Sequence, residues 1–103
     1  MTKLEQTRES KSVLEGYLSK CTGTIYTVWH KTTNDGMSRY ISVYVMVEGH
    51  IINLTWHIAK VLGYRLSLDR QLIMPGCGYD VGYHIADRLR QVFNVPNFSH
   101  TWI

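Results

Sequence analysis

Apolar and polar residues alternate along this chain in two periods, one typical of helices and one of strands. In residues 2–20 the apolar positions Leu14, Tyr17 and Leu18 fall on one face at helical spacing. The first ten residues add only Leu4 and the initial Met1 as large apolar side chains. We therefore expect a helix over residues 2–20 that docks by its second half, with residues 1–12 solvated or frayed.

Two segments after this helix have the composition of strands. Residues 24–30 are β-branched or aromatic almost throughout, and residues 40–47 alternate in polarity. One side of the second segment carries the aliphatic residues Ile41, Val43, Val45 and Val47, and the other carries Tyr40, Ser42, Tyr44 and Met46. Turn residues at 33–36 join the two segments, which predicts a hairpin. Its aliphatic face should pack on helices, while its tyrosine face is partly wet or covered by a partner.

Shorter elements follow the hairpin. We expect a strand over residues 51–54, then a helix over 56–62 that Thr55 caps and Gly63 ends. Two further short strands are expected over residues 64–68 and 72–74.

The last helix has the clearest amphipathic pattern. Its apolar residues are Val81, Ile85, Leu89 and Val92, at spacings of four, four and three. The aromatic tail, residues 95–103, should pack back on the body or form an edge strand. This order predicts one α+β domain over residues 1–103, with a small antiparallel sheet (the central hairpin plus short strands) packed against three helices.

Composition adds an expectation about partners. Seven tyrosines and three tryptophans are many for 103 residues, and such rings often lie at interfaces. The candidate partner-binding residues are Tyr40, Tyr44, Trp56 and Trp102. The apolar area of the hairpin face and the tail also makes a homodimer possible.

Charge and cysteine content exclude several classes of protein. The net charge of +3 comes without the dense Lys/Arg tract of a nucleic-acid-binding arm. Two cysteines make no disulfide framework, no secretory leader opens the chain, and the apolar runs are too short for a membrane span. No CxxC or HxxxH spacing indicates a metal site, so we expect no metal, no cofactor and a cytoplasmic location.

Residues 76–84 read Gly-Cys-Gly-Tyr-Asp-Val-Gly-Tyr-His, which is unusually rich in glycine. If Asp80 caps the last helix, the backbone N–H groups before it can form a cradle for an anion. The alternative is structural: the glycines allow a tight turn with positive φ, and Gly82 lets another element pack closely on the helix. Cys77 with His84 would be a nucleophile pair, although an Asp80–His84 contact one helical turn apart needs no catalysis.

A second cluster lies in the hairpin. His30 should be close to Ser38 and Arg39 across the two strands, and the guanidinium of Arg39 suits a phosphate or carboxylate. If this cluster faces the glycine-rich stretch, the two form one site for an anionic ligand. The candidate ligand-binding residues are then His30, Ser38, Arg39, Gly76, Cys77, Gly78, Asp80 and His84. The alternative is a surface Arg39 that pairs with Asp35 or Asp80.

These segments also carry a resemblance. His-Lys-Thr-Thr-Asn-Asp-Gly-Met-Ser-Arg (30–39), Ala-Lys-Val-Leu-Gly-Tyr-Arg (59–65) and the stretch 76–84 resemble, in order, motifs of small uncharacterised proteins encoded by bacteriophages and prophages. Those motifs read roughly H-x-S-x-S-G-M-S-R and G-C-G-M-D-M-G-F-H. This chain has Tyr79 and Val81 in place of the two methionines, and other residues in place of the first serines. The resemblance spans about residues 24–90 and transfers no catalytic role; it implies an accessory protein that acts in the bacterial host cell.

Three functions follow in order of preference. The first is a non-enzymatic binding protein that inhibits a host defence component such as a CRISPR effector, by contact with a defence protein or by sequestering an anionic small ligand. The second is a nucleotide- or phosphate-binding domain or small enzyme that uses His30, Arg39, Cys77 and His84. The third is a nucleic-acid-binding protein, whose basic residues would be Lys60, Arg65, Arg70, Arg88 and Arg90.

Overall fold

The computed structural model describes residues 2–76, 80–93 and 99–102, whose helices and strands have an α+β arrangement. The elements are α1 (Lys3–Lys20), β1 (Cys21–Thr32), β2 (Ser38–Val47), β3 (His50–Asn53), α2 (Thr55–Leu62), β4 (Arg65–Leu66), β5 (Leu72–Pro75), α3 (Asp80–Phe93) and β6 (Ser99–Trp102). The predicted order of helices and strands is therefore confirmed, and β1 is longer at both ends than predicted. Within these residues no helix is long and apolar enough to cross a lipid bilayer.

The sheet is built around the predicted hairpin of β1 and β2. Its strand order is β4-β5-β2-β1-β6, and β3 pairs with β2 beyond the end of β5. Every pairing is antiparallel except that of β6 with β1, which is parallel. The tail is thus an edge strand, as one of the two expectations had it. The predicted antiparallel sheet is confirmed, with one parallel pair added at its edge because α3 carries the chain back across the sheet before β6 begins.

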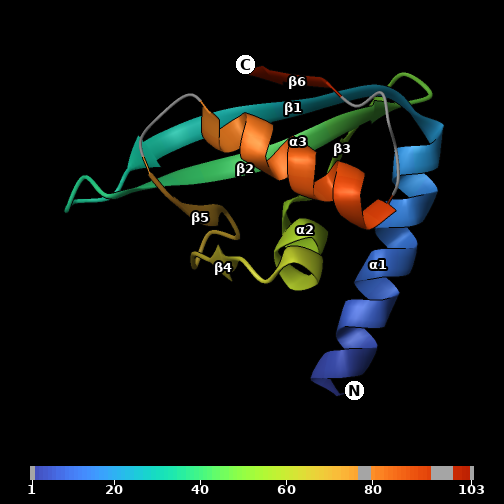
Figure 1. Cartoon of the computed structure of the whole chain (residues 1–103), viewed down its shortest axis with the longest axis horizontal. Helices are drawn as coiled ribbons and strands as arrows, with labels where there is room; N and C mark the ends of the chain where they lie inside the picture. Colours follow the sequence, from blue (N-terminus) through green and yellow to red (C-terminus); the bar gives the residue numbers. More distant parts are fainter. Residues whose placement is uncertain (1, 77–79, 94–98, 103) are drawn as a thin grey trace.

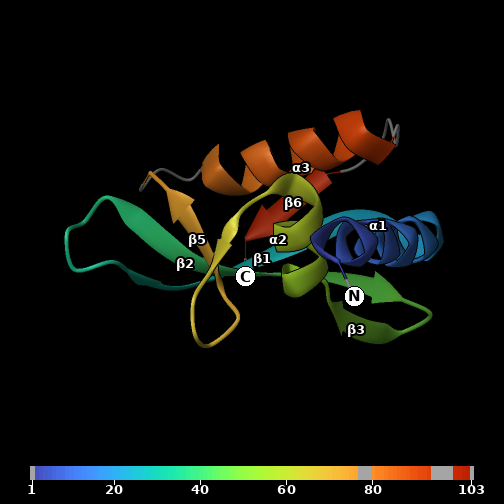
Figure 2. The same ribbon diagram turned by 90° about the horizontal axis from the view of Figure 1, so that it is seen from below.

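The aliphatic side of the hairpin forms the centre of the core. Ile41, Val43 and Val45 are at most 1% exposed, and Ile25 lies opposite Val45 in β1 and is fully buried. All three helices lie on this side of the sheet (Figures 1 and 2). The predicted one-sided covering is confirmed, and within the described residues no helix covers the other side.

Helix α1 docks mainly by its second half, as predicted. Thr2 caps its first turn through a bond from the Glu5 amide, and Leu4 is 61% exposed. Leu14 and Leu18 are buried. Ser10 is buried as well, and its hydroxyl lies 3.1 Å from Nδ1 of His57 in α2. A polar contact therefore extends the α1–α2 interface beyond the apolar residues.

Thr55 does not cap α2, so that expectation is wrong. The cap position belongs to Leu54, which makes no side-chain bond there. The Thr55 hydroxyl instead accepts a 2.9 Å bond from the backbone N–H of Val43 in β2, and it donates to Asn53 Oδ1 at 2.6 Å. Gly63 ends the helix in the left-handed conformation, as predicted.

Helix α3 buries three of its four predicted apolar residues. Val81, Ile85 and Leu89 are buried, but Val92 is 40% exposed. Phe93 packs against the core instead. The reason is helical geometry, because the buried residues follow one another at intervals of four positions. Each interval turns the buried stripe by about 40° around the helix axis, so the stripe includes position 93 rather than position 92.

Candidate functional site

The side of the sheet that faces away from the helices carries two of the four candidate partner-binding residues, Tyr40 and Tyr44. We call it the open face and define it by the outward-pointing residues Tyr26, Val28, Tyr40, Ser42, Tyr44, Met46, Ile51 and Ile73. Tyr26 lies directly opposite Tyr44 across the two central strands. The three tyrosines are half-buried, so each ring keeps part of its surface accessible.

The open face is hollowed at two places. A cavity of about 160 Å³ lies between Tyr26, Tyr44, Met46 and Ile51, and the Ile51 side chain is 70% exposed. A larger hollow of about 380 Å³ lies between Tyr40 and the β4–β5 turn. Apolar side chains line part of both hollows, and side chains of a partner surface can fill the hollows.

A β-bulge brings two further polar residues to this face. The register of β1 against β2 shifts between Trp29 and Lys31, so His30 and Lys31 both lie on the open side. Lys31 Nζ is 5.0 Å from the centre of the Tyr40 ring, and His30 Nε2 is 2.7 Å from Ser42 Oγ. Ser42 is only 5% exposed and belongs to a central strand whose backbone amides serve the sheet, which argues against a nucleophile with an oxyanion hole.

The charges of the sheet have one sign. The six described strands contain no aspartate or glutamate, whereas they contain Lys31, Arg39 and Arg65. Arg65 shares the open side because it pairs with Ile73, which in turn pairs with Tyr40. Asp69 of the β4–β5 turn lines the same hollow as Lys31, so Lys31 and Arg65 leave this end of the open face with a net positive charge, which is complementary to an acidic surface.

Arg39 points to the opposite side of the sheet from His30. Its side chain is 8% exposed, and its guanidinium carbon lies 4.7 Å from the Trp29 ring centre and 6.0 Å from that of Trp102. The expected His30–Arg39 pair is wrong because the bulge moves His30 to the open face. The expected surface position of Arg39 is also wrong, whereas its pairing with Asp80 stays a prediction because the Asp80 side chain lies outside the described residues. Ser38 takes part in the hairpin turn, where its amide donates to the Thr33 hydroxyl at 3.1 Å.

The hairpin and the start of the glycine-rich stretch do lie side by side. The Gly76 amide donates to the Met37 carbonyl at 2.8 Å, and Ser38 pairs with Pro75. Gly76 has φ +92°, which fits the interpretation of a tight turn. Cys77, Gly78 and the side chain of Asp80 lie outside the described residues, so the anion cradle, the Cys77–His84 pair and the Asp80–His84 contact stay predictions.

Gly82 has the close-packing role that the structural alternative gave it. A Cβ at this position would overlap the imidazole of His100 in β6. That ring is held by the Thr27 hydroxyl and by edge-on contacts with Tyr83 and Trp102, at 4.8 and 5.1 Å between ring centres. Burial lowers the pKa of His100, which favours the neutral ring.

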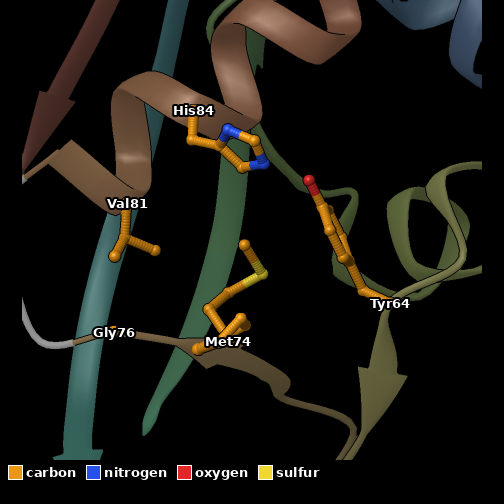
Figure 3. Close-up of a pocket in the computed structure, with 6 residues that line it drawn as sticks. Tyr64, Met74, Gly76, Val81 and His84 are labelled. Carbon is orange, nitrogen blue, oxygen red and sulfur yellow. The ribbon is translucent and has the colours of Figure 1, made fainter. Parts of the chain in front are cut away.

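His84 lines a separate cavity on the other side of α3. This cavity, of about 370 Å³, lies between α3, β5 and Tyr64, the second residue after α2. Figure 3 shows the Met74 side chain between the two walls, with the Tyr64 hydroxyl and the His84 imidazole pointing toward each other. Arg39 and His30 are not among the described residues that line it.

The four predicted partner-binding residues are divided among three surfaces. Tyr40 and Tyr44 share the open face, Trp102 packs on the helix side with Arg39, and Trp56 lies on α2 with Lys60 Nζ 5.2 Å from its ring centre. The alternation of residues 40–47 placed Met46 on this face, although it was not named as a partner-binding residue. Tyr26 and Ile51 were missed, and only the strand register, which places Tyr26 beside Tyr44 and Ile51 beside Met46, could have identified them.

The basic residues proposed for nucleic acid do not form a free patch. Arg88 Nη1 donates to the Leu62 carbonyl at 3.1 Å, and Arg90 pairs with Asp87. With Lys60 stacked on Trp56, three of the five have neighbours within the protein. Among the described residues, no group of three His, Cys, Asp or Glu side chains could hold a metal ion.

Comparisons with protein-family models, with curated proteins and with solved structures found no match.

Proposed function

We propose that this chain is a non-enzymatic binding protein whose open face binds a protein partner with an apolar centre and an acidic border. The observation that carries this proposal is the uncovered side of the sheet, where Tyr26, Tyr44 and Ile51 surround an apolar cavity. Tyrosine and methionine are enriched in the centres of protein interfaces. A tyrosine ring buries a large area with few rotatable bonds, and the flexible methionine side chain adapts its shape to the partner.

The sign of the charge supports the acidic border. Lys31 and Arg65 lie at the end of the open face near β4, where they outnumber Asp69, the acid of the β4–β5 turn that lines the same hollow as Lys31. Two cations are few for a nucleic-acid platform, which usually neutralises several phosphates along a strand. A protein partner therefore fits this face better than a nucleic acid.

We further propose that the partner is a host defence protein, such as a CRISPR effector. The ground for this step is the resemblance of segments 30–39, 59–65 and 76–84 to small phage-encoded proteins. Phage accessory proteins act on components of the host cell. A non-enzymatic binding protein inhibits such a component by covering the surface of that component.

The proposal can be tested with variants matched in chemistry. The double variant Tyr26→Ser/Tyr44→Ser removes two rings from the open face, whereas Tyr83→Ser removes an exposed ring from α3. The chain would be expressed in a host whose CRISPR system restricts a phage, and plaques would be counted. The wild type and Tyr83→Ser should restore plaques, and the double variant should not.

Binding is then measured directly. A partner captured from the same host should bind the purified wild type at least about tenfold more tightly than the double variant, which corresponds to about 1.4 kcal/mol. Equal affinity of both forms, a complex of two copies of this chain alone, or retention on single-stranded DNA that the double variant abolishes would each contradict the proposal.

A further inference from the structure

The hollow at the β4 end of the open face is lined by two side chains of opposite charge. Lys31 of β1 and Asp69 of the β4–β5 turn both line this space of about 380 Å³, and both are exposed, so a ligand in the hollow can reach both charges. A volume of this size lies in the lower part of the range for small-molecule sites, which fits a molecule with a single ring.

The two charges do not neutralise each other within the protein. Among the described residues the ion pair is that of Arg90 with Asp87, and Lys31 and Asp69 form none. The ammonium group of Lys31 lies over the Tyr40 ring instead, 5.0 Å from its centre. The lysine therefore keeps its capacity to donate to an anion, and the aspartate keeps its capacity to accept from a cation.

The turn that carries Asp69 has a fixed shape. The Arg70 amide donates to the Ser67 carbonyl at 3.0 Å, and the Ser67 amide donates to the Gln71 carbonyl at 2.9 Å. The Ser67 hydroxyl accepts a further bond from the Gln71 amide at 3.1 Å. These bonds hold Arg70 at φ +59°, a left-handed conformation that is unfavourable for a residue other than glycine. The backbone of Asp69 is thus in place before a ligand binds, which lowers the entropic cost of binding.

The remaining walls supply apolar surface between the two charges. Tyr40 of β2, Leu66 of β4 and Ile73 of β5 line the same hollow and are half-buried, so each keeps part of its side chain accessible. An aromatic ring of a ligand can pack on the Tyr40 ring with an offset or edge-on. The hollow therefore combines a cation, an anion and a wall that suits a ring.

We propose that this hollow binds a free α-amino acid with an aromatic side chain. The ammonium group of Lys31 would donate to the carboxylate of the amino acid, the carboxylate of Asp69 would accept from its ammonium group, and its ring would lie against Tyr40 and Ile73. A free amino acid carries both charges on one carbon, whereas a residue inside a peptide carries neither. This inference does not rest on the proposed function. Because Lys31 also belongs to the positive border of the open face, a bound amino acid would compete with an acidic partner for this lysine.

Three probes with the same ring test the two charges. L-Phenylalanine carries both charges, N-acetyl-L-phenylalanine lacks the cation, and L-phenylalaninamide lacks the anion. Each would be titrated into the purified chain and followed by NMR through the backbone amides and the methyl groups of Leu66 and Ile73. L-Phenylalanine should give saturable shifts around this hollow, and each analogue should bind about two- to fivefold more weakly, the range expected for one exposed ion pair.

Two substitutions assign each charge of the ligand to one residue. Lys31→Met should weaken the binding of L-phenylalanine about two- to fivefold but should not weaken that of L-phenylalaninamide, which has no carboxylate to lose a partner. Asp69→Asn should weaken L-phenylalanine by a similar factor but should not weaken N-acetyl-L-phenylalanine. Lys60→Met is the matched control, because Lys60 also lies over an aromatic ring, that of Trp56, and it should leave the binding of all three probes unchanged.

Absence of saturable binding up to the solubility of L-phenylalanine overturns the inference, as do shifts centred on Tyr26 and Ile51 or equal affinity for all three probes. It is equally overturned if Lys31→Met and Asp69→Asn bind L-phenylalanine as tightly as the wild type does. None of these outcomes contradicts the proposed function, because binding of the protein partner is measured separately with the variant Tyr26→Ser/Tyr44→Ser.

Discussion

At the scale of single residues, two helical glycines have opposite surroundings. A Cβ at Gly82 of α3 would overlap the buried His100 ring, whereas a Cβ at Gly16 of α1 would meet nothing within 4 Å. Because His100 is fixed by Thr27 and by two aromatic neighbours, it cannot move aside cheaply. We expect Gly82→Ala to lower the free energy of unfolding by about 1–3 kcal/mol, measured by urea denaturation.

The matched control is the same substitution in α1. Gly16→Ala should raise the free energy of unfolding by about 0.5–1 kcal/mol, because alanine restricts the unfolded chain and favours the helix. Adding His100→Ala to Gly82→Ala should cost less than the sum of the two single changes, since the overlap is removed. Equal effects at both glycines would show that β6 does not pack on α3 as described.

Two histidines make stability depend on pH. Burial lowers the pKa of His100 below its ordinary value of 6.5, and burial also lowers that of His57, against an opposing effect of Glu9. A lowered pKa in the folded protein means that the unfolded chain binds protons more readily. Stability is therefore complete above about pH 6.5 and falls as the pH drops below it toward the folded pKa values.

Urea denaturation at pH 7.5 and pH 5.5 checks this expectation. The wild type should be less stable at the lower pH, and His57→Gln should show a smaller decrease because one of the two titrating groups is gone. A stability that is equal at both values, or greater at pH 5.5, would refute the assignment.

At the scale of elements, Thr55 joins α2 to the centre of the sheet. Its hydroxyl satisfies the amide of Val43, and the Leu54 amide donates to the Val43 carbonyl at 2.9 Å, in the gap on the edge of β2 between β5 and β3. Thr55→Val keeps the shape but leaves the buried Val43 amide without this acceptor. We expect a loss of about 1–3 kcal/mol in the free energy of unfolding.

Thr55→Ser is the control because it keeps the hydroxyl and removes one methyl group. Its cost should stay near about 0.8 kcal/mol, the value for one buried carbon. If the valine variant were at least as stable as the serine variant, packing rather than the hydrogen bond would determine this junction.

The elements themselves were largely predictable from sequence, whereas the sides on which some residues lie were not. The alternation of residues 40–47 fixes which side of β2 is buried, because the period of a strand is two residues. The sequence around His30 gives no such signal for the bulge. The bulge places His30 on the opposite side of the sheet from Arg39, its expected neighbour. Thr55 was misplaced for a similar reason: its partner, Val43, lies in another element.

At the scale of the whole molecule, several unpredicted features depend on contacts between residues that are distant in the sequence. The parallel pairing of β6 with β1 joins Ile25 to His100, and no local pattern reports a pairing across such a separation. The same pairing places Trp102 beside Arg39 on the helix side rather than on an interface. The candidate site was therefore half predictable: Tyr40 and Tyr44 follow from alternation alone, but Tyr26 and the cavity near Ile51 require the assembled sheet.

The tail strand β6 covers the edge of β1 and packs against α3. Removing residues 99–103 deletes β6, which pairs with β1 and lies against α3, and it exposes Thr27 and the Gly82 side of the helix. Loss of the buried His100 and Trp102 contacts should cost about 2–3 kcal/mol or more. Hydrogen exchange should show amides of α3 losing protection first, since that helix loses the strand it packs on.

A deletion of similar size at the other end supplies the comparison. Residues 2–8 are mostly exposed and precede Ser10, the first buried residue of α1, so their removal should shift the unfolding midpoint little. Protection in α3 should then stay at the wild-type level. If both deletions had equal effects, or if α3 kept its protection without β6, the helix would be held by the hairpin alone, and the parallel edge strand would be an addition to the fold rather than part of its cooperative unit.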